Sequence, residues 1–141
     1  MSSFLAPSTH NGTITYGYLV DMVERYFNAV DDYDMDGVLS LFNEDAVFTI
    51  QSAHAVHTGR DEGIRQMYVE LFENYRRHMR HIHFRHVADP DNNRVASQFT
   101  VELTDNDGNE ITLTNANFFY LENGKFSRVY VYMSDGANVL N

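Results

Sequence analysis

Histidine is the residue type through which this chain is best equipped to do chemistry near neutral pH. The chain has seven histidines and no cysteine in 141 residues, and three of the histidines stand close together as His81, His83 and His86. An imidazole changes charge between about pH 5 and 8, so it can serve as a general base, a general acid or a metal ligand. The sequence therefore points to proton transfer or to histidine-based metal binding, and the lack of cysteine excludes thiolate chemistry.

A metal site is one possible use of these histidines. His81 and His83 are separated by one residue, a spacing that can put two ligands on one face of a strand, and His54 with His57 forms a second pair. The glutamate that normally follows such a histidine pair is missing, and no H-E-x-x-H motif occurs. We therefore expect no metal and no cofactor, and we expect His54 and His57 to line the mouth of a pocket.

A histidine base needs a group that orients its ring, and Asp31 is the best candidate. It stands in an acidic cluster with Asp32 and Asp34, which could also be no more than a solvated turn at the end of a helix. A carboxylate near a helix C-terminus is unfavourable against the helix dipole, which suggests that one of the three has another task. Asp31 follows Phe27 by four residues, so its side chain should lean toward the buried stripe.

The helices that must position these residues are visible in the spacing of apolar side chains. Steps of three and four residues predict a helix over 18–30, a short helix over 35–42 and a longer helix over 60–79. Residues 1–15 are rich in Ser, Thr, Gly, Asn and Pro and are expected to form a flexible leader. Residues 16–141 are then expected to form a single domain.

The strands are expected mainly in the second half of the chain. Turns rich in Asp, Asn and Gly separate stretches with a period of two, as tight hairpins require. Helices followed by an antiparallel meander predict an α+β fold, with the helices covering one face of a curved sheet. A loop is expected over 52–59, and strands are expected over 46–51, 80–88, 94–104, 110–121 and 125–134.

The charge balance narrows the range of partners. The formal net charge is −10 and the sequence pI is about 4.9, so no extended basic surface is available for nucleic acid or anionic membranes. The N-terminal stretch lacks the pattern of a secretory signal, and no apolar run is long enough for a membrane span. We expect a cytoplasmic protein that acts on a small molecule.

The segment ERYFNAVDDYDMDGVLSLFNEDAVF, followed by Gly59 before the long helix, resembles the SnoaL-like and ketosteroid-isomerase-like families of the nuclear-transport-factor-two-like superfamily. The resemblance covers residues 18–133 and implies a cone-shaped curved antiparallel sheet packed on three N-terminal helices. This fold hosts isomerases, dehydratases, epoxide hydrolases, cyclases and non-catalytic binding proteins, so the fold alone names no reaction.

Individual positions of the resemblance narrow the choice of reaction. Tyr26 matches the oxyanion-hole tyrosine of ketosteroid isomerase. Ile50, however, occupies the position of that enzyme's general-base aspartate, and Asn117 falls at about the position of its oxyanion-hole aspartate. The chain looks closer to the branch of scytalone dehydratase and hexachlorocyclohexane dehydrochlorinase, which pairs an aspartate at the end of the first helix with a histidine on a strand. By this resemblance Asp31 and His83 form the pair.

The resemblance implies a cofactor-independent lyase or isomerase acting on a small hydrophobic, cyclic substrate. His83 would remove a proton, Asp31 would orient His83, and Tyr26 with Asn117 would steady the developing charge. A polyketide cyclase with the same base and a non-catalytic protein that binds small molecules are the alternatives. The substrate is expected to contact Tyr132, Tyr68, His54, His57, Phe48, Phe99 and Phe119.

Strict alternation along the RHIHFRHVA segment leaves two arrangements open. His81, His83 and Arg85 share one face, and Ile82 and Phe84 share the other. In one arrangement Ile82 and Phe84 lie in the core and the histidines face water. In the arrangement that the resemblance implies, His83 faces the pocket and the apolar pair covers the outer face, where a second copy of the chain would bury it as a homodimer.

Overall fold

Three α-helices precede most of the sheet along the chain. The structure is a computed structural model and describes residues 14–134, so nearly all of the expected leader lies outside the described residues. Helix α1 spans Tyr16–Asp31, α2 spans Met35–Leu39 and α3 spans Arg65–Asn74, and a π-helical turn at Gly59–Ile64 leads into α3. No helix among residues 14–134 is long and apolar enough to cross a membrane.

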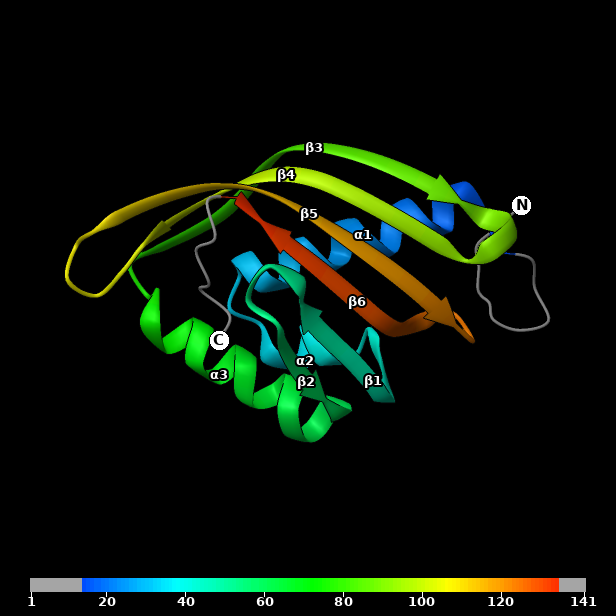
Figure 1. The fold of residues 1–141 in the computed structure, drawn as a ribbon, viewed down its shortest axis with the longest axis horizontal. Helices are drawn as coiled ribbons and strands as arrows, with labels where there is room; N and C mark the ends of the chain where they lie inside the picture. The colour runs from blue at the N-terminus through cyan, green and yellow to red at the C-terminus, as the bar shows by residue number, and fades with distance from the viewer. Residues whose placement is uncertain (1–13, 135–141) are drawn as a thin grey trace.

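Six strands form one curved, unclosed sheet, and the predicted α+β class with helices against a curved sheet is confirmed. The strand order is β2-β1-β6-β5-β4-β3. Neighbouring strands are antiparallel except for β1 and β6, which are parallel. Figure 1 shows β3 to β6 curving over α1, with α3 lower in the view. The strands are β1 Phe42–Ile50, β2 Ala55–Thr58, β3 His78–Asp89, β4 Arg94–Thr104, β5 Glu110–Glu122 and β6 Lys125–Met133.

Helix α1 forms where the apolar period predicts it. The Thr15 hydroxyl accepts a hydrogen bond from the Tyr18 backbone N–H at 3.1 Å, which caps the first turn. One stripe of the helix is buried against the inner, concave face of the sheet, and Asp31 is the last helical residue at the end of that stripe. The buried residues are Leu19, Met22, Val23, Tyr26, Phe27 and Val30.

Two segments differ from the expectation. The loop expected over 52–59 contains the short strand β2, which pairs with β1 through Thr49 and Val56. The helix expected to reach Met79 ends at Asn74, and Met79 instead lies on β3 beside Leu103. Tyr75 and Met79 fit the helical spacing, but they are not part of α3. The helix ends before them because Arg76 and Arg77 add no apolar surface that would hold a further turn against the core.

A β-bulge in β3 decides which side chains face inward. Ile82 pairs with Thr100 and Arg85 pairs with Gln98, so His83 and Phe84 together lie opposite the single residue Phe99. His83 has a φ of 59°, in the left-handed region that one of the two residues of a bulge can adopt. The bulge interrupts the inward and outward alternation of side chains along β3, from which the faces of His81, His83 and Phe84 were predicted.

The expected placement of His83 inside the fold is therefore wrong. His81 faces the interior, His83 is exposed at the bulge, and Phe84 returns to the inner side, where its ring centroid lies 4.9 Å from that of Phe27. Phe84 thus does not cover the outer face as expected. The exposed apolar side chains of the outer face include Phe118 and Tyr132, on β5 and β6.

Candidate active site

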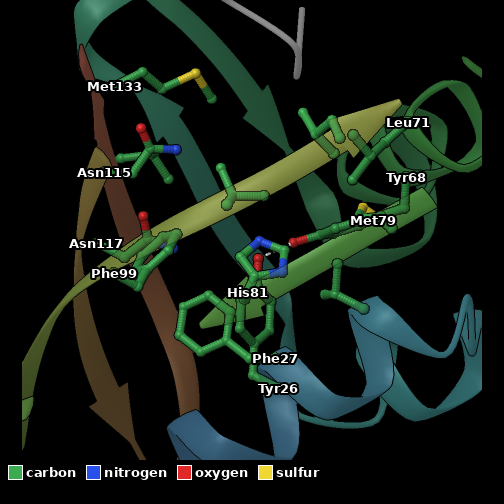
Figure 2. A pocket seen from close by; sticks show the side chains of 14 residues that line it. Tyr26, Phe27, Tyr68, Leu71, Met79, His81, Phe99, Asn115, Asn117 and Met133 are labelled. Atoms are coloured by element: carbon green, nitrogen blue, oxygen red, sulfur yellow. Dashed lines mark hydrogen bonds between the residues drawn. The ribbon is translucent and has the colours of Figure 1, made fainter. Parts of the chain in front are cut away.

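The helices and the inner face of the sheet enclose an apolar cavity. Its volume is about 30 Å³ for the centres of water-sized molecules and about 410 Å³ of atom-free space when the open mouth is included. The first value corresponds to one or two waters, so a ring compound bound here would also occupy the open mouth. Figure 2 shows side chains from α1, α3 and the strands converging on this space. The cavity is lined by Tyr26, Phe27, Val30, Tyr68, Leu71, Met79, His81, Phe99, Val101, Leu103, Asn115, Asn117, Val131 and Met133.

Asp31 and His81 form the most polar contact at the cavity wall. The Asp31 Oδ1 lies 2.5 Å from His81 Nδ1, and the Asp31 Oδ2 accepts a hydrogen bond from the His81 backbone N–H at 2.9 Å. The two side chains are 22% and 12% exposed. Both carboxylate oxygens therefore hold the same residue, which fixes the position of the ring and of the strand that carries it.

The contact between α1 and β3 extends beyond this pair. Glu24, Phe27 and Asp31 lie at steps of three and four residues on α1, so they share one face of the helix. Each of them contacts β3. The Glu24 Oε2 lies 3.7 Å from His86 Nε2. The Phe27 ring packs on the rings of His81 and Phe84, and Asp31 binds His81 as described above. We call these six residues the α1–β3 seam. Phe27 and His81 of the seam line the cavity, and Glu24, Phe84 and His86 do not.

Two buried tyrosines supply hydroxyl groups to the same cavity. The Tyr26 hydroxyl on α1 is hydrogen-bonded to the Tyr68 hydroxyl on α3. Burial, which disfavours the charged phenolate, is the main cause that raises the pKa of both tyrosines. The negative charge of Asp31 raises the pKa of Tyr26 further. Both groups are therefore neutral hydrogen-bond donors at physiological pH.

The β5 wall of the cavity carries two asparagines. Asn115 and Asn117 are 6% and 3% exposed, and both point into the cavity (Figure 2). The Asn115 Oδ1 accepts a hydrogen bond from the Ser134 backbone N–H at 3.4 Å. The Asn117 Oδ1 is buried without a hydrogen-bond partner among the described residues. An acceptor left in this state is costly unless something in the cavity satisfies it.

Several side chains expected at the site do line this cavity. They are Tyr26, Tyr68, Phe99 and Asn117, and Asp31 adjoins the cavity through His81. The histidine of the pair is the exception, since the structure puts His81 rather than His83 against Asp31. His81 belongs to the same H-x-H motif and could have been chosen as the partner of Asp31. No local signal marks the bulge, because its residue with positive φ is His83 and not a glycine.

The other expected contact residues lie elsewhere. Tyr132 is 47% exposed on the outer face, so its expected contact with a ligand in this cavity is wrong. Phe48 and Phe119 are fully buried, and both contribute to the core around Phe42 and Phe126 instead of to the cavity wall. His54 is exposed, and His57 is half-buried on β2. Neither histidine is among the residues that line the cavity.

The sequence had also raised the possibility of a metal site. Among residues 14–134, no group of three or more His, Cys, Asp or Glu side chains is arranged to hold a metal ion. His81 is turned to Asp31, His83 is at the bulge and His86 Nδ1 lies 2.8 Å from the Ser97 hydroxyl. The three histidines of β3 thus point to three different surroundings.

The curved sheet and its cavity agree with what comparison of the sequence finds. The sequence profile of the SnoaL-like domain matches residues 23–129, about three quarters of the chain. The chain belongs to the SnoaL-like domain family. The matched range includes both members of the Asp31–His81 pair and both tyrosines of the cavity. No curated protein sequence matches this SnoaL-like chain.

Solved structures share the fold of this SnoaL-like domain. A candidate polyketide cyclase from Silicibacter sp. TM1040 is 22% identical, with a TM-score of 0.74 over 85% of this chain and 91% of that one. A candidate isomerase from Bacillus subtilis is 14% identical, with a TM-score of 0.75 over 84% and 88%. A candidate aromatic ring hydroxylase from Novosphingobium aromaticivorans is 27% identical, with a TM-score of 0.67 over 83% and 87%.

Proposed function

We propose that the SnoaL-like domain removes a proton next to a carbonyl group of a small hydrophobic ring compound, with His81 as the general base. The observation that carries this proposal is the double hydrogen bond between Asp31 and His81 at the wall of an apolar cavity. An imidazole held in this way works as a base near neutral pH. Isomerases, dehydratase-type lyases and cyclases all need this first step.

The tautomer of His81 follows from its partner. A carboxylate can only accept, so Asp31 Oδ1 favours a proton on His81 Nδ1. The other ring nitrogen, Nε2, then carries a lone pair, and it has no hydrogen-bond partner among residues 14–134. When Nε2 takes a proton from the substrate, the ring becomes positive beside the negative carboxylate of Asp31, which stabilises the charged state.

The charge that develops on the substrate needs a donor in the same dry space. Tyr26 and Tyr68 have two hydroxyl protons and share only one of them in their mutual hydrogen bond. The second proton is available to a substrate oxygen. Such a donor, already oriented and shielded from water, stabilises an enolate far better than a mobile solvent molecule does.

The proposal is tested by deuterium exchange at the carbon next to the carbonyl of 1-tetralone, followed by NMR in D2O. Wild-type protein should accelerate exchange above the buffer rate, and His81→Gln should lower the enzymatic rate by at least about 100-fold. His83→Gln is the matched control, since it changes a histidine two residues away that is exposed. If His81→Gln and wild type exchange at equal rates, His81 is not the base.

A polyketide cyclase is an equally supported form of the same chemistry. The supporting observation is that several solved relatives of similar fold are described as candidate polyketide cyclases. Ring closure by condensation begins with the same proton removal, and the roles of His81 and Tyr26 do not change. A linear compound with carbonyl groups at alternate carbons would then be converted to a ring product, whereas an isomerase or dehydratase would leave it unchanged.

We also propose that a second copy of the chain covers the outer face of the sheet. Phe118 and Tyr132 lie side by side there, with their ring centroids 5.8 Å apart, and are 42% and 47% exposed. Tyr120 and Tyr130 form another ring contact on the same face. Exposed aromatic side chains grouped in this way are typical of an interface, and the same patch can meet itself across a two-fold axis.

A further inference from the structure

The contact with Asp31 fixes one atom of the His81 ring but not the tilt of the ring plane. A hydrogen bond to Nδ1 at 2.5 Å sets the distance of that nitrogen from the carboxylate. The torsion about the Cβ–Cγ bond of a histidine is broad, so the plane of the ring is weakly determined by the side chain itself. The lone pair of Nε2 lies in the ring plane and changes direction with the tilt. Other groups must hold the ring if Nε2 is to point at one place in the cavity.

Two phenylalanines from different elements pack against this ring. The ring centroid of Phe27, on α1, lies 5.0 Å from that of His81, and the centroid of Phe99, on β4, lies 5.3 Å from it. The two phenyl rings are 4.7 Å apart, so the three rings form a closed triangle (Figure 2). Phe27 and Phe99 are 2% and 3% exposed, and both line the cavity. We call these two phenylalanines the aromatic clamp.

The β-bulge of β3 supplies a third phenyl ring, which supports the aromatic clamp from behind. Because of the extra residue, Phe84 turns to the inner side, where its ring centroid lies 4.9 Å from that of Phe27 and 6.0 Å from that of Phe99. Phe27 is therefore packed between His81 and Phe84 and cannot swing away from the imidazole. Bulges beside active sites commonly re-aim a side chain in this way.

Phenyl rings suit this task because they leave Nε2 free. They offer no strong hydrogen-bond donor or acceptor, so they hold the imidazole without occupying the lone pair that takes the substrate proton. The proton also makes the ring of His81 positive, and a cation within about 6 Å of a phenyl centroid is attracted to the ring. The aromatic clamp thus fixes the neutral base and favours its charged product.

We infer that Phe27 and Phe99 are positioning residues, which hold the His81 ring in the one orientation that directs Nε2 into the cavity. The inference rests on the proposed function for the identity of the base. It adds that Asp31 alone does not orient this base, and that the bulge serves the site by turning Phe84 against Phe27.

The ring nitrogens of His81 report on the aromatic clamp without any catalysis. In ¹⁵N NMR spectra at pH 9, wild-type protein should show one protonated and one unprotonated ring nitrogen, as a single tautomer bound to Asp31 requires. In Phe27→Leu and in Phe99→Leu the two signals should move toward each other, because the ring samples further orientations and tautomers. Signals that stay as far apart as in wild type in both variants would overturn the inference.

Phe48→Leu is the matched control for loss of packing. Phe48 is fully buried and packs on Phe42, and it does not line the cavity. This variant should lose stability as the clamp variants do and still keep the two nitrogen signals of His81 apart. If Phe48→Leu moves the signals as much as Phe27→Leu does, the effect is general loosening of the core and the inference fails. Methionine at position 27 or 99, which nearly preserves the volume, replaces leucine in any variant that does not fold.

Deuterium exchange into 1-tetralone gives the second readout. The rate at saturating ligand should fall at least about tenfold in Phe27→Leu and in Phe99→Leu, because small displacements of a catalytic group cost rate. The ligand concentration for half-maximal rate should change less than about threefold, and Phe48→Leu should keep the rate within about twofold. A rate at saturation that both clamp variants retain would overturn the inference.

The two readouts separate this inference from the proposed function. If His81→Gln exchanges at the wild-type rate but the clamp variants still merge the nitrogen signals of His81, the general-base role fails and the positioning of the ring stands. If exchange depends on His81 but neither clamp variant alters the signals or the rate, the base stands and only the role of Phe27 and Phe99 is refuted.

Discussion

The two faces of the sheet use the same residue types in opposite ways. On the inner face, Tyr26 and Tyr68 reach in from the helices, are almost completely buried and bond to each other. On the outer face, Phe118 and Tyr132 are about half exposed and contact each other edge to face. The inner face also carries asparagines at positions that a strand of a stable core would fill with apolar residues.

The two faces of the sheet show which residues support stability and which support function. Strand β5 places Asn115 and Asn117 inside and Phe118 outside, the reverse of what burial of apolar surface alone would select. Reversals of this kind persist where a site or an interface gives the exposed or buried group a role. Both reversals occur on one strand, so changes to β5 should affect ligand binding from one face and self-association from the other.

The largest effect that the comparison predicts comes from the inner face at Asp31. Asp31→Asn keeps a hydrogen-bond acceptor for the His81 ring but removes the negative charge that stabilises the protonated imidazole. The rate of deuterium exchange into 1-tetralone should fall by about 10- to 100-fold. NMR measurement of the exchange rate at saturating ligand checks this prediction.

Glu24→Gln is the matched control at the other end of the α1–β3 seam. Glu24 lies 3.7 Å from His86 Nε2 and does not line the cavity, so the same change of charge should leave the exchange rate within about twofold. Equal losses in the two variants would mean that the charge of the whole seam matters, and the pairing of Asp31 with His81 would have no special role.

The tyrosine pair gives the next largest effect, on stability. Tyr68→Phe leaves the Tyr26 hydroxyl buried without its partner, so the free energy of unfolding should fall by about 1–3 kcal/mol. Urea denaturation at pH 8 measures the change. Tyr132→Phe on the outer face removes the same atom from a side chain that is 47% exposed, and it should change stability by less than about 0.5 kcal/mol.

The pH dependence of stability follows from the same two tyrosines. Their pKa values are raised above the ordinary value of 10.0, mainly by burial. Above pH 10 the unfolded chain loses phenol protons that the native state keeps, so the free energy of unfolding must fall as the pH rises. Tyr68→Phe should make this decline shallower between pH 10 and 11 than in wild type. A decline of unchanged steepness would show that other groups cause it.

Sequence patterns anticipated the helices and the hairpins much better than the details of β3. The stripe of α1 from Leu19 to Val30 is buried as its period predicts, because one face of a helix is determined by residues close in the chain. The direction of each side chain on β3 depends on the register with β4, which no local pattern encodes. The extra residue at the bulge therefore turns His83 outward, although strict alternation had put it on the same face as His81.

The bulge itself gives a further prediction, with a smaller effect than Tyr68→Phe. His83 has a φ of 59°, a conformation that glycine adopts freely and that β-branched residues strongly disfavour. His83→Val should lower the free energy of unfolding by about 1–2 kcal/mol, and His83→Gly should leave it within about 0.5 kcal/mol of wild type. Thermal and urea denaturation of the two variants measure the difference. Equal stabilities would mean that β3 adopts its register without the left-handed residue.

The smallest effect on chemistry should come from the outer face. Tyr132→Glu and Phe118→Glu each put a charge into the exposed aromatic pair and leave the cavity side of β5 and β6 unchanged. Light scattering after size exclusion should show a shift from dimer to monomer, because two like charges would meet across the two-fold axis. The exchange rate per chain should stay within about twofold of wild type, since no outer-face residue lines the cavity within the described part of the chain. If wild-type protein is already monomeric at 100 µM, the proposed interface does not exist. A large loss of exchange in the monomeric variants would show that the two faces are coupled through β5 and β6.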